Sequence, residues 1–441
     1  MGTSAGMLPG RSTLTPLRVI RSCSAPLKEN LLKAIVGGNL IDGTGAAAVV
    51  DSTVLIDGER IVEVGQRAAV TVPSDADVVD ATGMTVMPGL IDCHDHLASE
   101  NYDIMSRWGL DDPASLRFLR TANVLEDTLA SGYTSARDGG GLDAGFKIAI
   151  EEGVISGPRL MLSINLISPT GGLSDRVSPS GHRNQLYADP RMPSGVGNGP
   201  DGVRERVREM VRAGADVIKF ATTGGASTRP GHGPRDAAFE EAEIDAIVSQ
   251  AASQGRKTMC HAIAGPGLRM AIEADVGSIE HGCYLSETPD LIRLMADTNT
   301  FFVPTLMVYE FHSTVSPTHV KERALELADA HRLSIEMALS MGVKVVAGTD
   351  AGGFVHGDNA REIELLVEKG LTPMQAIQAA TGWAAECIGL DADVGSLEAG
   401  KYADLLVIDG DPLTDIGVLR KRKLFKLGLK GGDTFVDAIG E

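Results

Sequence analysis

Eight short apolar runs alternate with helical stretches along the middle of the chain, and this order restricts the fold more than any other feature. Each run is followed by a helix or by enough residues to form one. Strands that alternate with helices are typical of parallel α/β folds, and eight such units predict a (β/α)8 TIM barrel. The predicted strands are Met84–Ile91, Tyr133–Arg137, Arg159–Ile164, Asp216–Phe220, Lys257–His261, Ser278–His281, Thr300–Pro304 and Lys344–Gly348.

The two ends of the chain predict a second, smaller unit. Residues 33–81 hold short strand-forming runs that are separated by Gly-rich turns, a pattern typical of hairpins. A related strand-forming run returns at Ala403–Asp409. Both ends therefore build one small β-domain around a long insertion. The predicted domains are a β-domain of residues 31–83 and 394–441 and a barrel of residues 84–393.

Residues 1–30 show no pattern of a folded domain. They contain arginines but no acidic residue before Glu29, and they lack a continuous apolar segment of signal-peptide length. We interpret this stretch as a disordered arm of a cytoplasmic protein. A processed targeting segment is the alternative interpretation.

Charge and cysteine usage exclude several classes of protein. The 441-residue chain has a formal net charge of −19, which argues against nucleic acid and anionic membranes as partners. No apolar run in the sequence approaches the length of a membrane span. The 5 cysteines are irregularly spaced, so no disulfide framework is indicated.

Six side chains that can bind metal fall at the carboxyl ends of predicted strands, where barrel enzymes place their chemistry. Side chains alternate along a strand, so His94 and His96 share one face at the end of the first strand while Asp95 points away. Such a His-x-His pair alone also occurs by chance in loops. The remaining candidates are Lys219, His261, His281 and Asp350 at the ends of the fourth, fifth, sixth and eighth strands.

Lys219 has two interpretations. A bare ammonium buried in an apolar strand is costly, so the side chain is either exposed at the strand end or chemically modified. Addition of CO2 to the amine would give a carbamate, an anionic ligand with two oxygens.

The string PGLIDCHDHL at 88–97 and the strand-end set resemble the binuclear branch of the metal-dependent amidohydrolase superfamily, from about Lys33 to Asp411. The resemblance implies that the domain from both chain ends is a β-sandwich. It also implies two Zn²⁺ ions, with other divalent ions as alternatives, and a CO2-derived carbamate on Lys219 that bridges them. In this assignment one ion is held by His94, His96 and Asp350, and the other by His261 and His281.

The same resemblance implies a catalytic role for Asp350. Zinc lowers the pKa of bound water enough for attack near neutral pH. Asp350 then accepts the proton and delivers it to the leaving nitrogen. Mononuclear deaminases of the superfamily typically carry a glutamate three residues after the fifth-strand histidine, where this chain has Ala264. This difference favours hydrolysis of an amide over deamination.

Three further strings resemble zinc carboxypeptidases, prolidase-like dipeptidases and ochratoxinases, which release a C-terminal amino acid from an N-acyl partner. They are TSARDGG at 134–140, ISPTGG at 167–172 and IKFATTGG at 218–225. Relatives often carry a histidine directly after Thr-Gly-Gly, but this chain has Leu173, which can contact an aromatic group. We therefore predict an N-acyl amino acid or dipeptide-like substrate, such as ochratoxin A cleaved to ochratoxin alpha and phenylalanine.

Other residues are assigned from their position in the sequence. Three histidines in or beside a helical stretch, His312, His319 and His331, are interpreted as structural. The candidate substrate contacts are Leu173, Thr170, Gly224, His182, His232 and His356.

Two other functions stay open at this point. One is a hydrolase of cyclic amides such as lactams, hydantoins or imidazolones. The other is a non-catalytic scaffold, although such descendants normally lose metal ligands and this chain keeps all six. The family resemblance also implies a homo-oligomer, with an octamer as one form.

Overall fold

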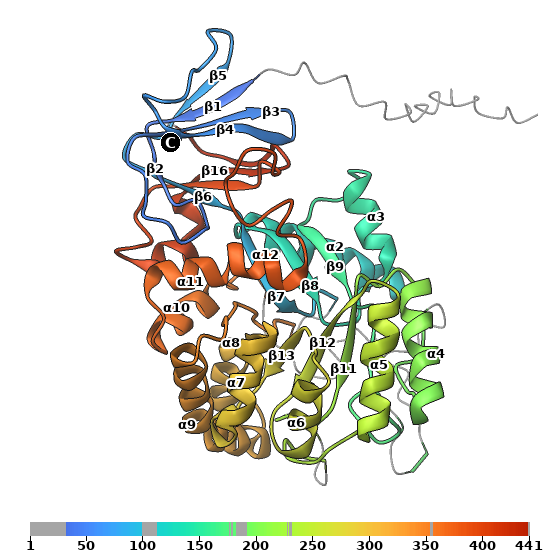
Figure 1. The fold of residues 1–441 in the computed structure, drawn as a ribbon. Coiled ribbons are helices and arrows are strands. Elements are labelled where there is room, and N and C mark those ends of the chain that lie inside the picture. The colour runs from blue at the N-terminus through green and yellow to red at the C-terminus, as the bar shows by residue number, and fades with distance from the viewer. Residues whose placement is uncertain are drawn as a thin grey trace, which may run out of the picture.

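The protein consists of a small β-domain beside a larger domain in which helices surround parallel strands (Figure 1). The computed structural model describes residues 32–98, 113–175, 177, 180–181, 192–226, 228, 232–352 and 356–439. The predicted arm of residues 1–30 lies outside the described residues.

The β-domain contains two sheets that share one apolar core. The first has the order β4 (Arg60–Gln66), β3 (Ser52–Asp57), β1 (Lys33–Val36) and β5 (Asp77–Asp80). The second has the order β17 (Asp433–Asp437), β16 (Phe425–Lys430), β15 (Leu405–Ile408), β6 (Thr85–Pro88) and β2 (Asn39–Leu40). Side chains from both chain ends, such as Val54 and Leu405, meet in this core. The second sheet therefore joins the two ends of the chain.

Gly89 marks the change from one domain to the other. β6 pairs antiparallel with β15 in the small domain, whereas β7 (Leu90–Asp95) pairs parallel with β8 (Tyr133–Asp138). A Cβ atom at Gly89 would lie 2.2 Å from Thr134 Oγ1, so only glycine allows this close crossing. The predicted first barrel strand, Met84–Ile91, is thus two strands, and the change of sheet falls at Gly89 rather than at residue 84.

The larger domain is α/β and TIM-barrel-like. One parallel sheet has the order β7, β8 and β9 (Arg159–Leu162). The other has the order β10 (Leu166–Ile167), β11 (Val217–Ala221), β12 (Lys257–Ala262), β13 (Ser278–His281) and β14 (Phe301–Val303). Asp216 N donates to Leu162 O at 2.7 Å between the two sheets. Residues 344–351 form only isolated bridges, yet they bond to both β14 and β7 through Lys344 O and Ala347 O.

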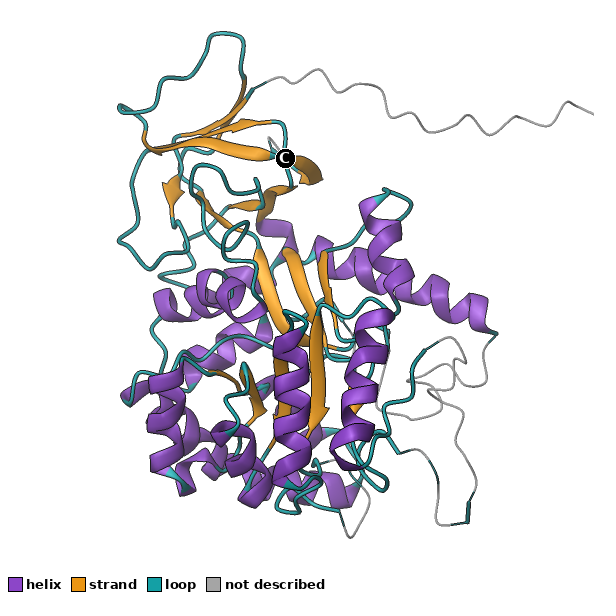
Figure 2. Cartoon of the chain, turned by 45° about the vertical axis from the view of Figure 1, so that its right-hand side comes forward, coloured by secondary structure: helices purple, strands orange, loops and turns teal. Residues whose placement is uncertain are grey.

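Helices cover the outside of these strands (Figure 2). In α4, Val203, Val207 and Met210 are buried at helical spacing, which seals one face against the sheet. No helix among the described residues has the length and apolar character that a membrane span requires. The helices are α2 (Ala114–Ala130), α3 (Ala144–Glu151), α4 (Gly199–Arg212), α5 (Glu241–Ser253), α6 (Gly265–Glu273), α7 (Pro289–Thr298), α8 (Leu306–Thr314), α9 (Thr318–Ser340), α10 (Arg361–Glu368), α11 (Pro373–Ala379) and α12 (Gly382–Ile388).

Candidate metal centre

All six predicted donors line one cavity of about 460 Å³ at the carboxyl ends of the strands. Each donor comes from a different position in the fold, but the parallel strands bring their ends to the same edge. The donors are His94 in β7, His96 directly after it, Lys219 in β11, His261 in β12, His281 at the end of β13, and Asp350 in the segment that follows β14 and α9.

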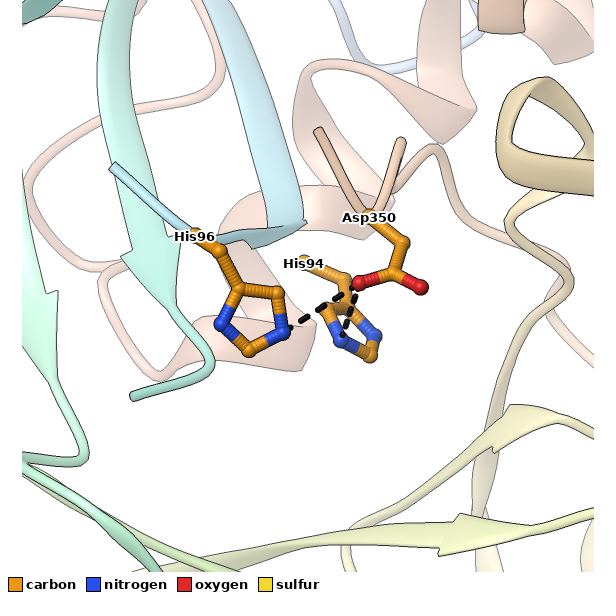
Figure 3. Close-up of side chains that lie close together, drawn as sticks. All are labelled: His94, His96 and Asp350. Carbon is orange, nitrogen blue, oxygen red and sulfur yellow. Dashed lines mark ion pairs between the residues drawn. The ribbon is translucent and has the colours of Figure 1, made fainter. Parts of the chain in front are cut away.

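Three of the donors converge tightly (Figure 3). Asp350 Oδ1 lies 3.2 Å from His96 Nε2 and 3.6 Å from His94 Nε2. One ligand atom from each of these residues lies within 4.8 Å of the others. Two imidazole nitrogens and a carboxylate oxygen form a donor set that zinc accepts, so the residues present fit a divalent ion.

Two of the donors adopt backbone conformations that glycine usually occupies. His281 has φ 72° and Asp350 has φ 54°. Left-handed conformations cost energy for residues that carry a Cβ, and they gather at functional sites. Both residues end a strand-like segment, and the turn of the backbone accompanies side chains that line the cavity.

The metal-facing nitrogens are selected by hydrogen bonds on the opposite side of each ring. The Nδ1 atom of His94 lies 2.8 Å from Glu280 Oε2, that of His96 lies 3.0 Å from Gly140 O, and that of His281 lies 2.8 Å from Thr305 Oγ1. Outer partners of this kind fix the ring orientation and leave Nε2 for a metal. Sequence reasoning did not identify Glu280, Gly140 or Thr305, because none of them is adjacent to its histidine in the chain.

The second group of donors lies beside the first. The ring centroids of His261 and His281 are 4.4 Å apart, and Lys219 Nζ lies 3.4 Å from His94 Nε2. His261 Nε2 contacts Gly224 O at 3.2 Å, so an ion bound at this nitrogen would replace that hydrogen bond.

Burial sets the charge state of these donors. It lowers the pKa of His261 to about 4, with Lys219 adding to the effect, and keeps this imidazole neutral at physiological pH. Lys219 is only 2% exposed, which excludes the exposed interpretation of this side chain. Burial lowers the pKa of its amine to about 8, although Glu280 and Asp350 oppose the change. A larger share of the lysine is therefore in the neutral form that can react with CO2.

Only some of the predicted substrate contacts lie at the cavity. Leu173 and His232 line the cavity. Gly224 contacts His261 through its carbonyl, and the exposed Thr170 pairs with Asn198 instead of lining the cavity. His182 lies outside the described residues.

His356 also lies away from the cavity lining. It is buried, and its Nε2 atom lies 3.0 Å from Asp95 Oδ1, on the face of β7 opposite the metal donors. His356 therefore contacts the first strand instead of lining the cavity, and its role toward substrate stays a prediction.

Two histidines that were not among the predicted site residues also line the cavity. They are His312 and His319, which were interpreted as structural, and their position makes them candidate substrate contacts. His312 belongs to α8 and His319 to α9, and both helices follow β14. The carboxyl end of the seventh strand lies at the same end of the domain as the metal donors. The position of His312 and His319 after this strand could therefore have identified them from the sequence.

A TIM-barrel-like α/β domain with imidazole and carboxylate donors at its strand ends is the architecture of a class of hydrolases. The chain belongs to the amidohydrolase family, whose sequence model matches residues 85–434. It is therefore an enzyme, an amidohydrolase.

Individual members of the family are similar to this chain over most of its length. Ochratoxinase from Aspergillus niger is 32% identical over 429 residues, which cover 93% of this chain and 88% of that protein. The structure of a prolidase complexed with N-methylphosphonate-L-proline superposes with a TM-score of 0.83 at 32% identity, covering 91% of this chain and 99% of that one. Imidazolonepropionase from Streptomyces griseus is 25% identical and covers 84% of this chain.

Replacement of His96 tests the metal centre directly. We expect His96→Ala to lower the metal content of purified protein, because it removes one of three converging donors. Elemental analysis by mass spectrometry measures the ratio of metal to protein. His319→Ala is the matched control, since His319 lines the same cavity but is not a predicted donor, and it should keep the wild-type ratio. Equal ratios in wild type and His96→Ala would contradict the assignment.

Proposed function

We propose that the protein is a binuclear zinc amidohydrolase that cleaves the amide bond of an N-acyl amino acid and releases the free amino acid. The observation that carries this proposal is the convergence of all six donors on one cavity. His94, His96 and Asp350 would hold one ion, and His261 and His281 the other. A carbamate on Lys219 would connect them, and other divalent ions could occupy the same donors.

Bound zinc supplies Lewis acidity, which activates water and polarises the amide carbonyl. The chain itself must move a proton from the attacking water to a poor amine leaving group. Asp350 is the group available for this task, because its carboxylate faces the cavity beside His94 and His96. The histidines use their cavity-facing nitrogens for binding, so they cannot act as the base.

The cavity wall supports a substrate with two chemically different ends. Apolar side chains suit an aromatic acyl group, and imidazoles can bind the carboxylate of the amino acid. Among the described lining residues the only lysine or arginine is Lys219, so the carboxylate depends on histidines. The apolar wall contains Leu173, Val308, Tyr309 and Val320, and the imidazoles belong to His232, His312 and His319.

Ochratoxin A and acyl-proline compounds are the substrates to test first. The ochratoxinase relative supports the former, and the prolidase neighbour supports the latter. Imidazolonepropionase, at 25% identity, keeps cyclic amides as the alternative class.

The biological unit is part of the proposal. We propose a cytoplasmic homo-oligomer, with an octamer as one form, whose chains each contain a barrel and a β-sandwich domain. Sedimentation analysis of the purified protein would measure the number of subunits.

Asp350→Asn tests the proton-transfer role. The substitution keeps the size and one ligand oxygen but removes the basic carboxylate, so kcat should fall by about 10²–10⁴-fold. Metal content must be measured on the same sample. A variant that retains two ions and hydrolyses amide at nearly the wild-type rate would show that Asp350 is not the proton carrier.

Lys219→Ala tests the carbamate. The variant should lose most activity, and added acetate should restore part of it by supplying a carboxylate in place of the carbamate. Asp350→Asn is the matched control, because asparagine fills the space of the lost carboxylate and leaves no room for acetate. Absence of rescue together with unchanged metal content would contradict a bridging role for Lys219.

A substrate panel tests the reaction and the carboxylate contact together. Products of ochratoxin A, N-acyl amino acids and a cyclic amide can be identified by mass spectrometry, and we expect a free amino acid plus a carboxylic acid. Replacing the carboxylate of a cleaved substrate with a neutral amide should lower kcat/KM by about 10–100-fold, the worth of a hydrogen bond to a charged group. Preferential turnover of the cyclic amide would favour the alternative function.

A further inference from the structure

A buried ion pair lies beneath the candidate metal centre and belongs to none of the predicted metal ligands. Arg137 in β8 is 1% exposed and Glu280 in β13 is 0% exposed. Arg137 Nη2 donates to Glu280 Oε1 at 3.0 Å, although the two strands belong to different sheets. Removing two charges from water is costly, and a buried pair is therefore weak support for stability on its own. The other contacts of the pair indicate what it does.

Glu280 connects the pair to a metal donor. Its Oε2 atom accepts a hydrogen bond from His94 Nδ1 at 2.8 Å, and the Ser278 hydroxyl donates to its Oε1 atom. A neutral imidazole has a hydrogen on only one of its two ring nitrogens. A hydrogen on Nδ1 therefore leaves Nε2 with a free lone pair. That nitrogen faces the centre, 3.4 Å from Lys219 Nζ and 3.6 Å from Asp350 Oδ1.

Arg137 makes a second contact on the same strand as His94. Its Nε atom donates to Cys93 O at 2.6 Å, and Cys93 directly precedes His94 in β7. One guanidinium therefore holds both the backbone before His94 and the carboxylate on its ring. The planar donor geometry of arginine allows both contacts at once, whereas the ammonium group of lysine is a single compact charge.

We propose that Arg137 and Glu280 are a positioning pair that fixes the orientation and tautomer of His94 and so strengthens metal binding. The inference rests on the proposed function, because it requires an ion at His94. Neither residue lines the cavity within the described part of the chain, so neither contacts substrate. Outer partners of metal-binding histidines contribute about 10–100-fold to metal affinity.

The experiment measures Zn²⁺ affinity by competition with a chromogenic chelator. Glu280→Gln keeps the size of the side chain and removes the charge, and it should weaken affinity by about 10–100-fold. Arg137→Lys keeps the positive charge and should change affinity in the same direction by a smaller factor. The absorption spectrum of the Co²⁺-substituted protein should also change in both variants, because it reports the geometry of the ligands.

A matched control separates positioning from general loss of stability. Asp216 pairs with Lys147 at 2.9 Å in the same domain and accepts a hydrogen bond from Leu162 N, and in the described part of the chain neither side chain is hydrogen-bonded to a metal-binding histidine. Asp216→Asn should lower the melting temperature while leaving Zn²⁺ affinity and the Co²⁺ spectrum unchanged. Equal weakening of affinity in this control would overturn the inference.

The remaining outcomes are distinct. Wild-type protein that binds no divalent ion would refute the proposed function itself. If Glu280→Gln and Arg137→Lys both keep the Zn²⁺ affinity and the Co²⁺ spectrum of the wild type, only the positioning role is overturned. If these two variants do not fold, Ser278→Ala decides, because it removes one donor to Glu280 without altering charge. It should weaken affinity measurably, and wild-type affinity in this variant would overturn the inference.

Discussion

Parallel strand pairing is the constraint on which the metal centre depends. His261 is level with Ala221 in the pairing of β11 and β12, so it lies two residues beyond Lys219 along the strand direction. His281 is level with Ala262, one residue beyond His261. Two residues of strand span about 6.6 Å, and the long lysine side chain can cover this difference where a shorter residue could not. The register therefore explains why the deepest position carries lysine and the outer positions carry histidines.

Burial then prepares these donors for metal binding. A histidine must be neutral to bind a cation, and burial of His261 lowers its pKa to about 4. The same burial removes charged side chains from water, so a charge without a partner would be costly. The buried charges near the centre have partners of opposite charge. Arg137 is paired with Glu280, and Lys219 lies near both Glu280 and Asp350. The burial that keeps the imidazoles neutral is therefore compatible with charged side chains, because acidic and basic groups lie close together.

The pattern of the sequence was sufficient to predict an α/β, TIM-barrel-like fold and to select six candidate donors that line one cavity, because strand ends and helix spacing are local properties. The division at Gly89 was not predicted because Met84–Ile91 was interpreted as one strand, although the run contains Pro88 and Gly89. In the structure the two strands join at Gly89, where a Cβ atom would lie 2.2 Å from Thr134 Oγ1. His356 was placed at the cavity although it contacts Asp95 behind the strand. A loop sequence does not encode which side of a neighbouring strand its side chains reach.

His312 and His319 show a different limit of sequence reasoning. Their helical setting suggested a structural role, but α8 directly follows Thr305, a residue with φ 53° that also contacts His281. This turn brings the helix directly to the metal centre. Position relative to the seventh strand was therefore more informative than helical periodicity.

Part of the cavity wall is built on elements separate from the metal donors. The strands and the segment after them carry the donors, whereas α8 and α9 carry Tyr309 and His319. Arg323 of α9 donates to Ala226 O and Thr228 O, at 3.3 and 2.7 Å, and so fastens the loop after β11 to this wall. Substitutions in the helices can consequently change the shape and charge of the cavity without moving a metal ligand. Under the proposed function, this division would let substitutions in α8 and α9 change the preferred amide while the metal donors stay in place.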